Sequence, residues 1–176
     1  MISCSSSVTK KEYIEWVENP LNGLNNNKTL GDFSYSIQYK PLEYILIKKN
    51  NGINEKKDFQ NLHYIDLTLS NKMYSEYLKI DLEQKEDYYH RLKYFSFEIE
   101  NDVKLIDGKD SLRCVFSHYE RTYGITPYIK IVMAFEKKEE SKENLFFTYH
   151  DQLFNNGIIS IPIKRDELNN IPKIKI

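Results

Sequence analysis

Four side chains are the natural candidates for metal binding or acid–base chemistry: His63, His90, His118 and His150. No two are close in sequence, whereas zinc sites usually take ligands at short helical or hairpin spacings. The best local group is His118 with Glu120, which share one face if both lie on a strand, and His150 as a third member. These three are the candidate metal or acid–base residues. The alternative, which we favour, is a polar strand end in which Arg121 pairs with Glu120 or Asp151.

Motifs for covalent or cofactor chemistry are missing from the sequence. There is no Gly-x-Ser-x-Gly turn for a nucleophilic serine, and the 6 glycines are scattered rather than gathered in a phosphate-binding loop. Cys114 falls within an apolar stretch, which predicts a small buried residue and not a reactive thiolate. The sequence therefore predicts no catalytic residues, no bound cofactor and no enzymatic activity.

Aromatic side chains offer a different kind of chemistry, because the chain has 14 Tyr and 9 Phe. Exposed tyrosine is favoured at protein interfaces and on sugar-binding platforms, since it combines a flat apolar area with a polar hydroxyl. Most of these tyrosines are expected in the core or at its rim. A minority is expected on the surface, and the interface candidates are Tyr74, Tyr77, Tyr88 and Tyr89, together with Tyr13 and Trp16 of an N-terminal helix.

Charge argues against nucleic acid as a partner. The formal net charge is −1, from 25 basic and 26 acidic side chains. The two signs alternate along the chain, as in residues 136–140, whereas nucleic-acid-binding proteins usually gather a basic excess on one face.

The first residues, from Met1 to Ser7, resemble the end of a bacterial lipoprotein signal. An apolar residue and a small residue precede Cys4, and a serine run follows it. The resemblance implies that Cys4 receives lipid and becomes the mature N-terminus, although the basic and long apolar parts of such a signal are absent. It further implies an envelope protein of Bacteroidetes type, anchored to the outer membrane and facing the periplasm. An incidental cysteine at the end of the chain is the alternative.

The secondary-structure signals begin with a capping box from Thr9 to Glu12, followed by apolar residues on one helical face up to Asn19-Pro20. This predicts a short N-terminal helix whose apolar side packs on the body of the protein or, alternatively, meets a partner. Asp32–Lys40 alternates with period two and predicts a strand with Phe33, Tyr35, Ile37 and Tyr39 on one face.

Further strands are predicted over the following ranges: 63–69, 94–99, 103–106, 112–118, 128–135, 145–149, 158–163 and a short edge piece at 173–176. Residues 25–27 are predicted to be a turn-rich connection. The segment 42–47 fits a buried strand or a short helix starting at Pro41. Residues 71–82 fit sheet or helix, and 83–91 a surface helix or an ordered loop.

Short strands separated by turns predict a mainly β fold, an antiparallel β-sandwich of Ig or transthyretin type with a short N-terminal helix and one or two further short helices. Residues 1–8 are expected to be a lipoprotein tether and 9–176 a single domain. The leading functional hypothesis is a non-catalytic accessory lipoprotein that docks on an envelope protein in a secretion, motility or uptake assembly. A binding module for a small ligand or glycan and a periplasmic immunity-type lipoprotein are the alternatives.

Overall fold

A computed structural model describes residues 7–49, 60–138 and 141–174. Within these ranges eight strands form one antiparallel sheet in the order β1-β2-β3-β6-β5-β4-β7-β8. The strands are β1 (Asn25–Leu30), β2 (Phe33–Lys40), β3 (Leu62–Asn71), β4 (Val103–Asp107), β5 (Asp110–Glu120), β6 (Tyr128–Glu136), β7 (Leu145–Asp151) and β8 (Gly157–Ile163).

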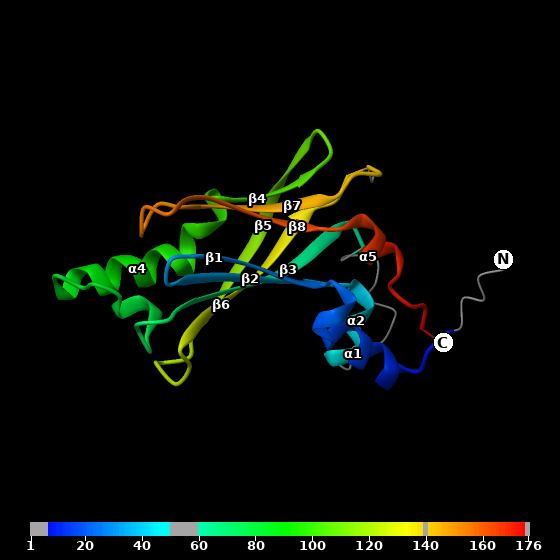
Figure 1. Ribbon diagram of the computed structural model, residues 1–176, viewed down its shortest axis with the longest axis horizontal. Coiled ribbons are helices and arrows are strands. Elements are labelled where there is room, and N and C mark those ends of the chain that lie inside the picture. The colour runs from blue at the N-terminus through cyan, green and yellow to red at the C-terminus, as the bar shows by residue number, and fades with distance from the viewer. Residues whose placement is uncertain (1–6, 50–59, 139–140, 175–176) are drawn as a thin grey trace.

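The long strand β5 turns this sheet back on itself. Residues Asp110–Arg113 pair with β4, whereas the part from Cys114 to Glu120 pairs with β6. The register shifts between Cys114 and Phe116, and a bulge of this kind bends a strand and increases its twist. As a result β4, β7 and β8 lie over β1, β2, β3 and β6 (Figure 1), and β8 approaches β1 to leave a barrel-like, nearly closed sheet.

The core fills the space between the two layers. Alternate residues of the central strands point inward and are fully buried, including Ile65, Leu67 and Leu69 of β3 and Ile129, Ile131 and Met133 of β6. Their neighbours in sequence point outward. The same alternation on β2 buries Tyr35 and Ile37 and leaves Ser34, Ser36 and Gln38 on the outer face.

Helices close the two ends of the sheet. α1 (Lys10–Glu18), α2 (Leu42–Lys48) and α5 (Arg165–Asn169) lie at one end, and α4 (Lys85–Phe97) lies at the other (Figure 1). Short 3-10 helices flank them: η1 (Pro20–Asn22), η3 (Tyr77–Lys79) and η4 (Ile99–Asn101). No helix in the described part of the chain is long and apolar enough to cross a bilayer.

The predicted antiparallel, mainly β fold with a short N-terminal helix is confirmed. Thr9 Oγ1 accepts a hydrogen bond from the Glu12 amide at 3.3 Å, and Thr9 N–H donates to the Glu12 carboxylate at 2.8 Å, so the capping box forms. The apolar side of α1 packs on the body through Tyr13 and Val17. A sandwich of two separate sheets is not confirmed, because β5 belongs to both layers.

Two local predictions need correction, and one open alternative is decided. The strand predicted over 94–99 is instead the end of α4, followed by η4, because the helix that starts at Lys85 continues and buries Tyr94 and Phe95 against the core. The turn-rich segment 25–27 is the start of β1, which pairs with β2 despite its asparagines. The segment 42–47 takes its helical alternative. For the short edge piece predicted at 173–176, the structure shows a single bridge between Ile174 and Val8. Residues 175–176 lie outside the described residues.

Candidate ligand-binding pocket

The predicted interface aromatics do not form one surface. Tyr13 and Tyr77 are buried, and Trp16 is half-buried against the N-terminal core cluster. Tyr74 is partly buried and its hydroxyl donates to Asp81. Tyr89 is exposed on α4. Two members of the set, Tyr77 and Tyr88, do meet in a pocket at the α4 end of the sheet.

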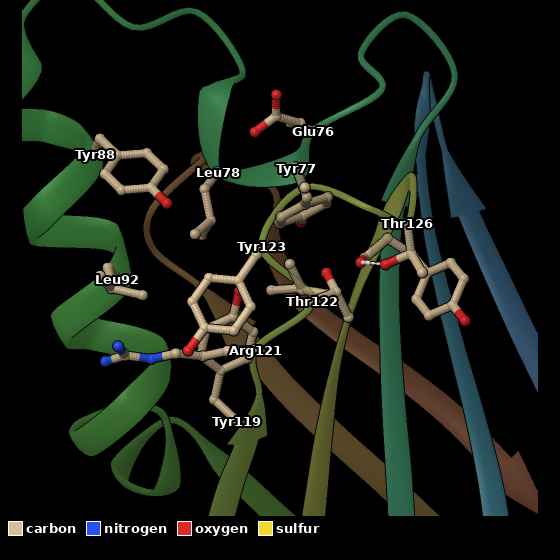
Figure 2. Close-up of a pocket in the computed structure, with 13 residues that line it drawn as sticks. Glu76, Tyr77, Leu78, Tyr88, Leu92, Tyr119, Arg121, Thr122, Tyr123 and Thr126 are labelled. Atoms are coloured by element: carbon tan, nitrogen blue, oxygen red, sulfur yellow. Dashed lines mark hydrogen bonds between the residues drawn. The ribbon is translucent and has the colours of Figure 1, made fainter.

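Five tyrosines from five segments line this pocket (Figure 2). Tyr77 comes from η3, Tyr88 from α4, Tyr119 from β5, Tyr123 from the β5–β6 loop and Tyr128 from the start of β6. The cavity volume is about 110 Å³. A cavity of ~150 Å³ in another protein accommodates a benzene ring. The tyrosine pocket is smaller than that cavity, so it can hold no more than one ring.

The β5–β6 loop carries Tyr123 to the pocket in a strained conformation. Ile125 N–H donates to the Thr122 carbonyl at 3.0 Å, and the two residues between them have positive φ, 51° at Tyr123 and 76° at Gly124. Such turns favour Gly, Asn or Asp at both central positions, and a bulky aromatic residue is disfavoured there. Tyr123 is nevertheless 86% exposed. Its ring is held out in solvent at a position that costs backbone energy.

A side chain in place of Gly124 would crowd the other side of the pocket. A Cβ at this position would lie 3.0 Å from a carboxylate oxygen of Glu76, in addition to the strain of its positive φ. The same carboxylate accepts a hydrogen bond from Lys79 Nζ at 2.7 Å. The glycine thus allows the loop to lie against the Glu76 side chain, which closes one wall of the pocket.

Arg121 provides a cation beside the tyrosines. The predicted pairing of Arg121 with Glu120 or Asp151 is wrong, because Glu120 pairs with Lys130 at 3.4 Å and the buried Asp151 accepts from the Tyr35 hydroxyl at 2.5 Å. Among the residues that the structure describes, Arg121 makes no ion pair and no hydrogen bond. Burial raises the pKa of the Tyr119 hydroxyl, and the nearby Tyr88 raises it further. The positive charge of Arg121 acts in the opposite direction and lowers this pKa.

A rigid aromatic cluster supports the pocket from behind. The Tyr77 ring meets Phe33, Phe95 and Phe154 edge-on, with centroids 6.3, 6.1 and 5.3 Å away. Arg91 of α4 stacks over Phe154 and donates to the carbonyls of Leu78 and Ile80, which joins η3 to α4. In Figure 2, Tyr88 and Leu92 point from α4 toward Tyr123, so the wall formed by η3 and α4 faces the loop.

The residues proposed for acid–base or metal chemistry are not brought together. His118 and Glu120 lie on the outer face of β5, and His150 lies on β7 in the other layer. Within residues 7–49, 60–138 and 141–174, no group of three or more His, Cys, Asp or Glu side chains is arranged to hold a metal ion. Cys114 is buried, as predicted, and burial raises its pKa to about 11, which disfavours the thiolate. Cys4 lies outside the described residues.

The sequence reasoning missed three of the pocket tyrosines, Tyr119, Tyr123 and Tyr128. The sequence contains one signal for this site, which is the Tyr123-Gly124 pair in the connection between two apolar strands. A turn glycine beside an aromatic residue in a connection indicates a ring held at the surface. Comparison of the chain with known proteins finds no matching family model, no matching curated protein and no matching solved structure.

Proposed function

We propose that this protein is a non-catalytic binding domain that holds one ring of a small ligand or glycan in the tyrosine-lined pocket. The observation that supports this most directly is Tyr123, an aromatic side chain held 86% exposed at a strained turn beside a small cavity. Backbone strain persists where the surrounding structure enforces it, and it concentrates at ligand-binding sites.

Physical chemistry favours a flat ligand with polar substituents. Tyrosines offer flat faces for stacking on an aromatic ring or on the C–H face of a sugar, and their hydroxyls can bond to polar substituents. Glu76 is already paired with Lys79, so its charge is compensated, whereas Arg121 can donate hydrogen bonds to a polar substituent of the ring. Ligand pockets of this kind combine mainly apolar walls with a few polar groups that fix orientation.

The test is an NMR titration of the ¹⁵N-labelled full chain with two panels of one-ring compounds. One panel contains glucose, galactose, mannose and N-acetylglucosamine, and the other contains benzyl alcohol and indole. We expect amide shifts in residues 122–126 with at least one compound. Tyr123→Ala should weaken that binding about ten-fold, because one lost aromatic contact is worth ~1–1.5 kcal/mol.

The matched control is Phe97→Leu, which removes an exposed aromatic ring from α4 outside the pocket. This variant should bind as the wild type does. If no compound of either panel shifts residues 122–126 at millimolar concentration, the pocket is not a ring-binding site and the proposal fails.

A second proposal is the lipid-anchored docking protein suggested by the N-terminal sequence. The position of the chain ends supports it. Val8 N–H donates to the Lys173 carbonyl at 2.9 Å, and this end of the molecule lies opposite α4 (Figure 1). An anchor at Cys4 would therefore leave the tyrosine pocket facing away from the membrane. Leu21, 91% exposed in η1, provides an apolar side chain for a docking partner.

Mass spectrometry of the protein from its native host tests this second proposal. Acyl groups on Cys4, and their loss together with membrane fractionation in Cys4→Ser, are the expected results. Unmodified protein in the soluble fraction would overturn the anchor and leave the pocket proposal untouched.

A further inference from the structure

The lining of the tyrosine pocket is not balanced in charge. It contains two charged side chains, Glu76 and Arg121. The Glu76 carboxylate is compensated, because it pairs with Lys79 Nζ at 2.7 Å. Arg121 is exposed, and it makes no ion pair among residues 7–49, 60–138 and 141–174. The pocket lining therefore carries one uncompensated positive charge.

The charge of Arg121 acts within the pocket as well as at its edge. Figure 2 shows the Arg121 side chain extending from the start of the β5–β6 loop toward α4. Tyr119, which also lines the pocket, is only 8% exposed, and the charge of Arg121 still lowers the pKa of its hydroxyl against the larger rise from burial. A ligand in the same cavity would experience the same charge, because screening by water is weak at a partly buried site.

Accessible hydroxyls add further hydrogen-bond donors to this lining. Tyr88 is half-buried, and Tyr123 and Tyr128 are exposed. Their three hydroxyls form no hydrogen bond within the part of the chain that the structure describes. A phenol donates one hydrogen bond and a guanidinium up to five, whereas the one carboxylate of the lining already accepts from Lys79. The free groups are therefore mainly donors, and a ligand substituent that accepts several hydrogen bonds is favoured.

The size of the cavity restricts the kind of ring. Its volume is about 110 Å³, less than that of the ~150 Å³ cavity that accommodates benzene. A sugar ring is thicker than benzene, because its carbons carry groups above and below the ring. A planar aromatic ring therefore fits better than a sugar, and aromatic pairs gain energy from stacked or edge-on contacts with tyrosine. So small a cavity leaves a substituent of the ring outside, toward the exposed Arg121.

A carboxylate is the substituent that suits Arg121 best. The guanidinium is planar, and its paired N–H donors match the two oxygens of a carboxylate. In benzoate the carboxylate is conjugated with the ring, so the whole molecule is flat and presents its oxygens at one edge. Hydrogen bonds between such charged groups are roughly twice as strong as those between neutral groups. An aromatic acid therefore combines the contacts that the tyrosines offer with the partner that Arg121 lacks.

We infer that the tyrosine pocket selects small aromatic carboxylates, with the ring held among Tyr88, Tyr123 and Tyr128 and the carboxylate bonded to Arg121. This inference rests on the proposed ring-binding function and names the chemical class of the ligand. It also assigns separate roles. The tyrosines contact the ring of acids and of neutral compounds alike, whereas Arg121 discriminates between them.

The test compares acids with neutral molecules that have the same ring, by NMR titration of the full chain at neutral pH. Benzoate is compared with benzyl alcohol, and indole-3-carboxylate with indole, while acetate supplies the carboxylate without a ring. We expect at least one acid to bind about ten-fold more tightly than its neutral counterpart and to shift the amides of residues 121–126. Acetate should bind far more weakly than that acid. In Arg121→Gln the affinity for the acid should fall to about that of the neutral counterpart measured on the same variant.

Arg113→Gln, which removes an exposed arginine of β5 outside the pocket, is the matched control and should keep the full preference for the acid. Dispersed NMR spectra of each variant establish that it is folded. Equal affinity for acids and neutral compounds, or a preference for acids that persists in Arg121→Gln, would overturn this inference and leave the ring pocket in place. Acetate binding as tight as that of benzoate would show an anion held without its ring and would also overturn it. If no compound of any kind shifts residues 121–126, the ring pocket and this inference both fail.

Discussion

Tyr123 brings strain and exposure together in one residue. Left-handed backbone costs an ordinary L-residue about 1–2 kcal/mol, and Asn tolerates it better than any large side chain. The ring gains little from burial in return, because most of it is in solvent. In the unliganded protein, tyrosine is thus a poor choice for stability at this position.

Replacement of Tyr123 by Asn is expected to stabilise the fold by about 1 kcal/mol while weakening ring binding, since the strain falls and the stacking surface is lost. Denaturant unfolding, read by circular dichroism, measures the first effect. Tyr89→Asn is the matched comparison, because Tyr89 is an exposed tyrosine with helical backbone and its replacement should bring no gain. A lower unfolding midpoint for Tyr123→Asn would contradict the strain argument.

At the scale of elements, α5 is joined to the sheet by a buried ion pair. Arg165 donates from Nη2 to Asp107 of β4 at 2.6 Å and from Nε to the Glu143 carbonyl at 3.0 Å. Burial alone would raise the pKa of Asp107, but the hydrogen bonds from Ser141 and Arg165 and the charge of Arg165 lower it below its usual value. The carboxylate therefore stabilises the folded state above its unfolded pKa of about 3.9, and this contribution is lost as the pH falls through the lower folded value.

Arg165→Leu should lower the free energy of unfolding by about 3 kcal/mol at pH 7, because it leaves a buried carboxylate without its cation. The deficit should shrink toward pH 4 and below, where protonated Asp107 no longer requires a positive partner. Denaturant melts of both proteins across this pH range give the comparison. Lys164→Leu breaks the neighbouring pair with Glu167, in which the lysine is exposed and the glutamate half-buried, and should change stability by no more than about 1 kcal/mol. A pH-independent deficit for Arg165→Leu would mean that lost packing, and not charge, is responsible.

For the whole molecule, the defining feature is an interior rich in tyrosine. Burial is the largest cause that raises the pKa of eight tyrosine hydroxyls: Tyr13, Tyr35, Tyr44, Tyr64, Tyr77, Tyr94, Tyr119 and Tyr149. Hydrogen bonds to carboxylates add to the rise at Tyr35, Tyr44 and Tyr94. These groups remain protonated in the folded state at pH values where an unfolded chain would release their protons.

Below pH ~10, the pKa of an unfolded tyrosine, these groups should therefore not change the free energy of unfolding with pH. Above that pH the free energy of unfolding should fall steeply. Absorbance of tyrosinate and far-ultraviolet circular dichroism, followed together through an alkaline titration, should report one common transition for the buried set. Tyr77→Phe removes a hydroxyl that has no hydrogen-bond partner among the described residues, so this variant should be more stable and less sensitive to high pH. Ionisation of all tyrosines before any loss of structure would rule out this account.

The sequence determined those features that depend on neighbouring residues. Period-two alternation identified β2 and most of the later strands, and the Thr9 capping box identified α1, because both signals arise from local geometry. Where local preference and long-range packing differ, as in the aromatic stretch 94–99 and the asparagines of β1, the tertiary structure decided the outcome. Helix α4 continues because its end buries Tyr94 and Phe95, and β1 is a strand because β2 pairs with it.

The candidate site depends still more on tertiary structure. The five pocket tyrosines come from five separate segments, and only the curl of the sheet and the docking of α4 place them around one cavity. Composition alone indicated that tyrosines would matter. Which of them share a pocket was decided by contacts between residues far apart in the chain, and the spacing of residues in a sequence does not encode such contacts.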